Sequence, residues 1–293
     1  MLLMGWSAAD FEYEHTIEGA TSASSVFPAL LCVAAAHHKT GEEFLAALAV
    51  GYELATRIAA ATTLGVEDVL GFHAAGLAGP ATAAAVGSLL HWDVETVASG
   101  MGVASSSAAG LLAYLSTGAD TRDLHAARAG QLGAEAAFMA HAGVLGPRDV
   151  LENPEGYLHA FSRHPKWHML NAKLGKDWTS AAMTLKLAPV HVWAQGFAYA
   201  IDQYRKQEKA TWTAEDIKNV TIFAGPAILD PMRYARAAER KFANVARVLG
   251  VTAEGQELKY SIKHLAAVED MSALMGKMVS MGKLAVSNVA AQG

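Results

Sequence analysis

Three short segments of the sequence place a basic or imidazole side chain among small or apolar residues. They are Gly71-Phe72-His73, Thr121-Arg122-Asp123-Leu124-His125 and Leu185-Lys186-Leu187. A histidine exchanges protons near neutral pH, whereas arginine and lysine bind and stabilise the charge of a carboxylate. Together these residue types predict an acid/base site for a small anionic substrate. Because the segments are far apart in the sequence, only the folded chain can bring them together.

The composition narrows the class of ligand. The 293-residue chain has a formal charge of −5, and it shows no cluster of lysine and arginine, so we do not expect nucleic acid as a partner. Hydrophobic residues make up 52% of the chain and charged residues 17%, which supports a substantial core. The single cysteine, Cys32, excludes an intrachain disulfide and favours a cytoplasmic location.

Neither a metal site nor a membrane span is predicted. Three histidines between residues 159 and 168 lack the spacing of a zinc motif, and the adjacent His37 and His38 cannot both point inward from a helix. The run from Ala74 to Leu90 approaches the ~20 residues that cross a bilayer, but it is dominated by alanine and contains Pro80. A buried helix is the better interpretation of this run.

The elements that must position these residues are helical at first and mixed later. Alanine-rich stretches with helical periodicity run from Val26 to about Ala142, with a capping box at Thr40-Gly41-Glu42-Glu43 and an N-cap at Asp93. Prolines and glycines between residues 143 and 177 predict a loop-rich region and a candidate domain boundary. A helix is expected over 190–206, and Val220-Thr221-Ile222-Phe223 has the composition of a strand. The sequence therefore predicts helices followed by an α+β portion.

Several short motifs resemble, in their order and spacing, those of the MmgE/PrpD family over roughly residues 5–267. The motifs are Val26-Phe27-Pro28-Ala29-Leu30, Val50-Gly51-Tyr52-Glu53-Leu54-Ala55-Thr56-Arg57, Gly71-Phe72-His73, Thr121-Arg122-Asp123-Leu124-His125-Ala126-Ala127 and Leu185-Lys186-Leu187-Ala188-Pro189. This family includes 2-methylcitrate dehydratases, cis-aconitate decarboxylases and an iminodisuccinate epimerase. The resemblance implies a short or truncated member, because the acidic motif here begins within a dozen residues of Met1.

The resemblance implies a mainly α protein with two domains. We expect a large all-α domain over residues 1–180, a smaller α+β domain over 181–270, and a tail over 271–293 that can dock back as a helix. The active site would lie in the cleft between the domains, and the protein would be a homodimer. The family's reactions need no metal or organic cofactor, and they move a proton at a carbon next to a carboxylate of a small di- or tricarboxylate.

The resemblance also implies four catalytic residues. His73 falls on the family's active-site histidine and Lys186 on its active-site lysine. Asp10 aligns with a functional aspartate, and the nearby Glu14 is expected to assist proton transfer. Two structural alternatives stay open: His73 could cap the start of a helix, and the acidic segment around Asp10 could be a solvated loop.

Three further residues are expected to bind the substrate. Arg122 lies where many family members have lysine or arginine, and its planar guanidinium suits bidentate binding of a carboxylate. His125 shares a helical face with Arg122, and His264 falls where members often place a tyrosine. The structural alternatives are that Arg122 pairs with Asp120 or Asp123 and that His125 is a structural histidine.

The sequence departs from the family pattern at Thr21-Ser22, where members often have His-Pro. If that histidine is the base in those members, another residue must serve here or the chemistry differs. The resemblance as a whole nevertheless implies a cofactor-independent lyase, either a dehydratase or a decarboxylase. The alternatives are an epimerase acting on a similar substrate and a non-catalytic binding or scaffold subunit.

Overall fold

The computed structural model describes residues 1–2, 4–5, 14–15, 22–62, 70–117, 119–186 and 195–208, with side chains except at positions 14, 15, 115 and 116. This part of the chain is mainly α-helical, as predicted. Its α-helices are α2 (Val26–Ala36), α3 (Gly41–Thr62), α4 (Gly79–Leu89), α5 (Val94–Ser106), α6 (Tyr114–Thr117), α7 (Thr121–His141), α8 (Tyr157–Phe161) and α9 (Gln195–Gln207). The 3-10 helices are η2 (Ala74–Leu77), η3 (Trp167–Met169) and η4 (Thr179–Ala182), and the strands are β1 (Glu14–His15) and β2 (Thr184–Leu185).

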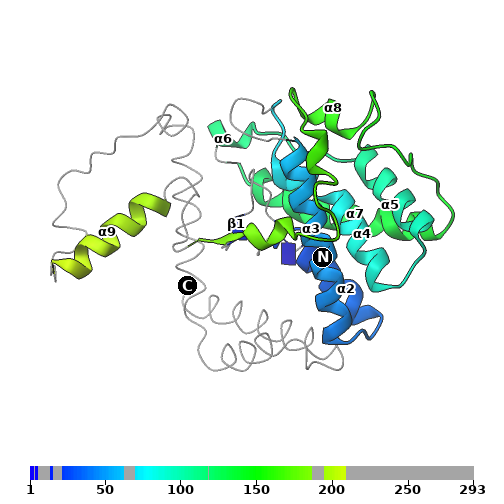
Figure 1. The fold of residues 1–293 in the computed structure, drawn as a ribbon, viewed down its shortest axis with the longest axis horizontal. Helices are drawn as coiled ribbons and strands as arrows, with labels where there is room; N and C mark the ends of the chain where they lie inside the picture. The colour runs from blue at the N-terminus through cyan, green and yellow to red at the C-terminus, as the bar shows by residue number, and fades with distance from the viewer. Residues whose placement is uncertain are drawn as a thin grey trace, which may run out of the picture.

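Five of the helices form a bundle with α4 at its centre (Figure 1). Helix α4 packs against α2, α3, α5 and α7, and α7 also packs against α5. Small residues allow these helices to approach closely. A β-carbon on Gly133 of α7 would collide with the carbonyl of Gly79 and with the side chain of Thr82, so this crossing has room only for glycine.

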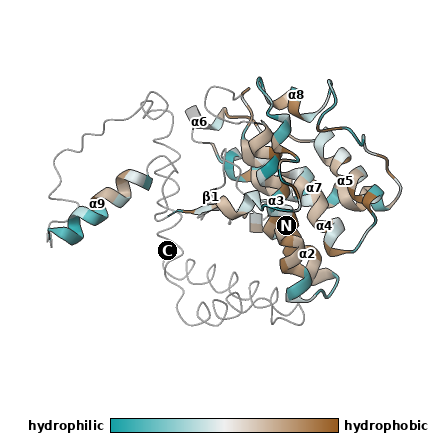
Figure 2. Ribbon diagram, viewed as in Figure 1, coloured by the Kyte–Doolittle hydropathy of each residue, from teal (hydrophilic) through white to brown (hydrophobic). Residues whose placement is uncertain are grey.

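The apolar core lies between the helices of this bundle. Helix α2 buries most of its residues and is largely coloured hydrophobic in Figure 2. Its Leu30 and Leu31 join Phe44 of α3 and Leu89 of α4 in one cluster, and each of the four is at most 1% exposed. Burying a side chain of this kind stabilises the fold by about 1.5–3 kcal/mol, so this cluster holds the bundle together.

The two predicted helix starts are confirmed. The Glu43 carboxylate accepts from the Thr40 backbone N–H (3.0 Å), and the Thr40 hydroxyl accepts from the Glu43 backbone N–H (3.2 Å). At the start of α5, the Asp93 carboxylate accepts from the Thr96 backbone N–H at 2.9 Å. Because these side chains satisfy N–H groups that have no partner within the helix, they fix where α3 and α5 begin.

The buried interpretation of the alanine-rich run after His73 is also confirmed, because it forms η2 and the buried helix α4. Among the residues that the structure describes, one helix, α3, is long and apolar enough by composition to cross a membrane. In the fold, 61% of its most apolar 18-residue window is buried. A helix in the core of a globular domain has the same length and composition.

Residues 143–182 form turns and short helices, so the predicted loop-rich region is confirmed. The region packs against the bundle: Tyr157 and Phe161 of α8 cluster with Ile58 of α3 and Leu77 of η2. The Tyr157 hydroxyl donates to the Leu77 carbonyl at 2.7 Å, and burial raises the pKa of this phenol. The region therefore covers the end of α3 and leads the chain toward β2.

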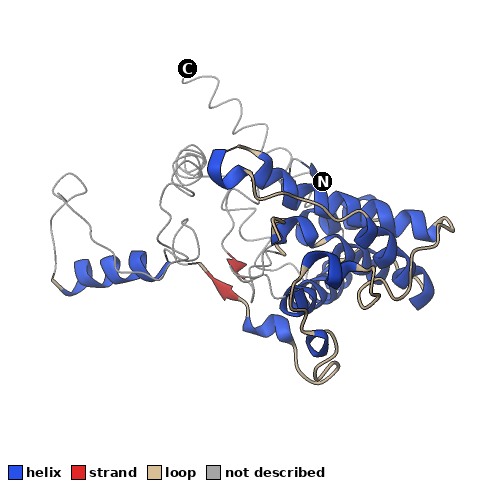
Figure 3. Cartoon of the chain, turned by 90° about the horizontal axis from the view of Figure 1, so that it is seen from above, coloured by secondary structure: helices blue, strands red, loops and turns tan. Residues whose placement is uncertain are grey.

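Strands β1 and β2 form a two-stranded antiparallel pair, in which Glu14 lies opposite Leu185 and His15 opposite Thr184. The sequence did not predict these strands, because two residues are too few to show an alternating pattern. Helix α9 overlaps the predicted 190–206 helix and ends one residue beyond it, and it lies apart from the bundle in both views (Figures 1 and 3). The predicted strand at 220–223, most of the 181–270 domain and the tail lie outside the described residues.

Candidate functional site

A short ribbon of backbone holds His73 in place. Phe72 forms an antiparallel bridge with Leu111, and the His73 N–H donates to the carbonyl of Gly110 at 2.9 Å. Gly71 and Gly110 have φ angles of +88° and +133°, which glycine adopts without a steric cost. The glycine in the Gly71-Phe72-His73 motif is thus needed for the turn that presents the histidine.

The side chain of His73 faces His125 of α7. Their Nδ1 atoms are 3.2 Å apart, within hydrogen-bonding distance. The Tyr114 ring packs edge-on against both imidazoles, with centroid distances of 5.2 Å to His73 and 5.9 Å to His125. The structure therefore brings together two of the predicted site residues and adds Tyr114, which the sequence did not single out.

The alternative role of His73 as a helix cap holds for its position but not for its side chain. His73 is the N-cap residue of η2, yet its side chain makes no capping hydrogen bond. Its Nδ1 atom instead meets His125.

A hydrogen bond between two Nδ1 atoms requires a proton on one ring and a lone pair on the other. Burial lowers the pKa of His125 from its ordinary value, because the partly buried ring is poorly solvated when charged. The charged form of His125 is therefore disfavoured. Gly110 covers the ring closely, because a β-carbon there would lie 3.1 Å from its Cγ. The contact with His125 engages His73 through Nδ1.

The lowered pKa of His125 predicts an acid-dependent loss of stability. Its folded pKa is below the unfolded value of about 6.5, so the unfolded chain binds more protons in this range. The free energy of unfolding should fall as the pH is lowered from about 7 to about 5. Urea titrations should show a shallower pH dependence in His125→Asn. The matched control is His38→Asn at an exposed position with a φ of 50°, which asparagine tolerates; an equal change in both variants would contradict the assignment.

Arg122 lies on α7 one turn before His125, but its guanidinium is engaged locally. Its Nη1 atom donates to the Asp123 carboxylate at 2.7 Å, and the two side chains are 23% and 10% exposed. The structural alternative of pairing with Asp123 is thus confirmed. Substrate binding by Arg122 stays a prediction, since an arginine has five N–H donors and one aspartate uses only part of them.

The second group of predicted residues meets at the β1–β2 pair. Lys186 directly follows β2 and is only 9% exposed, although Leu185 before it is 75% exposed. The backbone of Glu14 lies opposite Leu185 and therefore next to Lys186 in the ladder. Asp10 and His264 lie outside the described residues. The structure thus brings His73 and His125 together, places Arg122 on the same helix as His125, and places the backbone of Glu14 opposite the residue before Lys186.

Two deeply buried charges in the described residues belong to Glu53 and Arg57 of α3, which are 7% and 1% exposed. The Arg57 Nε atom lies 2.6 Å from the Glu53 carboxylate. Both residues lie in the Val50–Arg57 motif, but no role was predicted for them. The signal in the sequence was a pair of opposite charges four residues apart in an apolar part of the helix.

Metal ligation finds no support in the part of the chain that the structure describes. No three His, Cys, Asp or Glu side chains there lie close enough to hold a metal ion. Of the histidines considered for such a role, His159 packs its ring against Trp167, with centroids 5.0 Å apart.

A small, mostly apolar cavity lies between η2 and α3, next to the segment that carries His73. Its lining comprises Ser22, Ala55, Ile58, Ala59, Thr62, Ala74, Leu77, Ala78, Ala81 and Tyr157. The Ser22 hydroxyl is fully buried and has no hydrogen-bond partner. Ser22, the second of the two positions where family members often have His-Pro, therefore lies beside the segment that carries His73, whereas Thr21 lies outside the described residues.

The helical bundle and its histidine pair define a helical protein with an acid/base candidate site. Residues 1–170 match the MmgE/PrpD N-terminal domain, and the chain belongs to the MmgE/PrpD family. It is 28% identical over 232 residues to the cis-aconitate decarboxylase-like protein oryM of Aspergillus oryzae. That alignment covers 73% of this chain and 47% of the relative, so the chain spans about half the length of the curated protein it matches.

Proposed function

We propose that this protein is a cofactor-independent lyase, a dehydratase or decarboxylase, that acts on a small di- or tricarboxylate. The observation that carries the proposal is the 3.2 Å contact between the Nδ1 atoms of His73 and His125. Membership of the MmgE/PrpD family and the similarity to a cis-aconitate decarboxylase-like protein support the same class of reaction. The relative's name favours decarboxylation over dehydration.

In the proposed reaction, His73 is the general acid or base. A proton next to a carboxylate is weakly acidic, so the negative charge that develops on the carboxylate oxygens must be stabilised as the proton leaves. His125 orients the His73 ring through Nδ1, and we assign the proton exchange with the substrate carbon to Nε2. Lys186 and Arg122 would supply the positive charge that stabilises the developing anion.

The remaining predicted residues complete the site in this proposal. Asp10 and Glu14 would assist proton transfer, and His264 would bind a substrate carboxylate. Formation of a homodimer and a cytoplasmic location are part of the same proposal. An epimerase would begin with the same proton removal and differ only in the face that receives the proton back.

A second candidate is a non-catalytic subunit that binds a polycarboxylate. It is favoured by Thr21-Ser22, which replaces the His-Pro of many members, and by the unpartnered Ser22 hydroxyl beside the His73 segment. Such a protein would keep the carboxylate-binding residues without completing the proton transfer.

Proton NMR in D2O separates these candidates. The chain is incubated with cis-aconitate, 2-methylcitrate and iminodisuccinate, and both product signals and loss of the proton next to the carboxylate are followed. Product formation supports the lyase, and exchange of that proton with inversion but no other product supports the epimerase. A thermal shift with neither product nor exchange supports the binding subunit and overturns the enzymatic proposal.

A further inference from the structure

We propose that Glu53 and Arg57 act as a positioning pair that fixes where Lys186 enters the site. The inference rests on the proposed function, because it takes Lys186 to be a site residue. It adds two residues of α3 that do not themselves need to touch the substrate. Their task is to hold the segment before β2, which comprises residues 169–180, against the helix.

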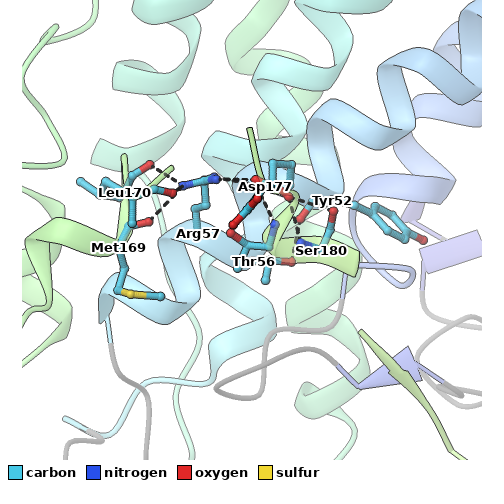
Figure 4. Close-up of polar contacts among 10 residues, drawn as sticks. Tyr52, Thr56, Arg57, Met169, Leu170, Asp177 and Ser180 are labelled. Carbon is cyan, nitrogen blue, oxygen red and sulfur yellow. Dashed lines mark hydrogen bonds and ion pairs between the residues drawn. The ribbon is translucent and has the colours of Figure 1, made fainter. Parts of the chain in front are cut away.

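Arg57 binds the first half of this segment through backbone oxygens. Its Nη1 atom donates to the Ala172 carbonyl at 2.9 Å and to the Leu170 carbonyl at 3.4 Å, and its Nη2 atom donates to the Asp177 carbonyl at 3.1 Å. Figure 4 shows the guanidinium reaching from α3 into this segment. One side chain thus fixes the path of a turn-rich stretch that has few apolar contacts of its own.

Glu53 binds the second half through donors at the start of η4. Its carboxylate accepts from the backbone N–H of Thr179 (3.0 Å), the backbone N–H of Ser180 (2.9 Å) and the Ser180 hydroxyl (2.8 Å). Burial opposes ionisation of Glu53, but these bonds and Arg57 together hold the pKa of its carboxyl below the ordinary value. The carboxylate therefore stays charged at neutral pH and keeps its hydrogen bonds to η4.

The anchored segment ends just before Lys186. Only residues 181–185 separate Ser180 from Lys186, and the last two of them, β2, pair with β1. Lys186 itself is 9% exposed. A lysine ammonium lies at the end of a long flexible side chain. The position at which the backbone is held therefore decides which region the ammonium group can reach. The Glu53–Arg57 pair supplies that constraint from the bundle, and β1 supplies it from the other side.

The test is the reactivity of Lys186 toward an amine-acetylating reagent, followed by mass spectrometry of the full chain after digestion. In Glu53→Gln, an NH2 group replaces one of the two carboxylate oxygens, so it faces either the N–H of Thr179 and the Arg57 Nε–H or the two donors of Ser180, and η4 should loosen from α3. We expect Lys186 to be acetylated about tenfold faster or more, since hydrogen bonds to a charged group are among the stronger ones. Lys39 on the far part of the bundle serves as the internal reference, and its rate should not change.

Two further variants keep the test decisive. Ser180→Ala removes one of the three bonds to Glu53 and should give a smaller acceleration in the same direction, even if Glu53→Gln does not fold. Arg148→Gln breaks the exposed ion pair with Glu95 and should leave the Lys186 rate unchanged. An unchanged Lys186 rate in folded Glu53→Gln, or in Ser180→Ala when Glu53→Gln is unfolded, would overturn the inference.

The labelling result is independent of turnover, so failure of the inference and failure of the proposed function can be told apart. If the wild type turns over a carboxylate but Lys186 labelling is insensitive to Glu53, the inference alone fails. If Lys186 is acetylated faster in Glu53→Gln but the wild type turns over no carboxylate, the proposed function alone fails. Where turnover is found, kcat/KM of Ser180→Ala should fall in parallel with the release of Lys186.

Discussion

Replacing His73 with glutamine is expected to lower kcat on the carboxylate substrate by about 10²–10⁴-fold, the usual contribution of a general acid or base. Glutamine can still form a hydrogen bond to His125, but it cannot exchange a proton near neutral pH. The backbone hydrogen bond from residue 73 to Gly110 does not depend on the side chain. The helical fold and the melting temperature should therefore change little while turnover is lost.

The measurement is initial product formation by NMR, with circular dichroism as the check on folding. His91→Gln is the matched control: its side chain is 69% exposed and lies 3.2 Å from the Glu43 carboxylate. This variant should retain the wild-type kcat. Wild-type turnover by His73→Gln on a proven substrate would remove His73 from the mechanism and leave the Gly71-Phe72-His73 motif as a mark of the fold.

Local patterns in the sequence were enough to predict a succession of helices in the first half of the chain and the starts of two of them. A capping box and an N-cap act within four residues, so their partners can be read directly from the sequence, as Thr40 with Glu43 and Asp93 with Thr96 show. Close packing of α4 and α7 follows in the same way from their alanine and glycine content.

The contacts that build the candidate site were less accessible to sequence reasoning. His73 and His125 were predicted to share a site, but their direct contact depends on how the 71–73 ribbon meets α7. Tyr114 packs on both rings, yet its own segment carries no motif. Side-chain partners that come from different elements leave no fixed spacing in the sequence.

The partners of Glu53 and Arg57 were even harder to predict from the sequence. Opposite charges four residues apart in a helix are spaced to pair, and the two side chains do pair, although this was not predicted. Most of their other partners are backbone groups of residues 169–180, and backbone atoms are common to every residue type. Only the structure could show that this pair ties the loop-rich region to the bundle.

Replacing Arg57 with methionine is expected to lower the free energy of unfolding by about 3–5 kcal/mol, as breaking a buried ion pair does. The side chain is 1% exposed, and its loss leaves the Glu53 carboxylate buried without its cationic partner. It also leaves the carbonyls of Ala172 and Asp177 without their donor. Urea unfolding measures the change, with Arg148→Met as the control on an exposed ion pair, where a loss of only about 0–1 kcal/mol is expected.

The pairing itself is tested by adding Glu53→Gln to Arg57→Met. If the main penalty is an uncompensated buried charge, neutralising Glu53 removes that charge, and the double variant should be less destabilised than the sum of the two single losses. Strictly additive losses would mean that the two side chains stabilise the fold separately. Because both anchor the same segment before Lys186, the coupling measured in this cycle is the part of the stability that the buried pair contributes as a unit.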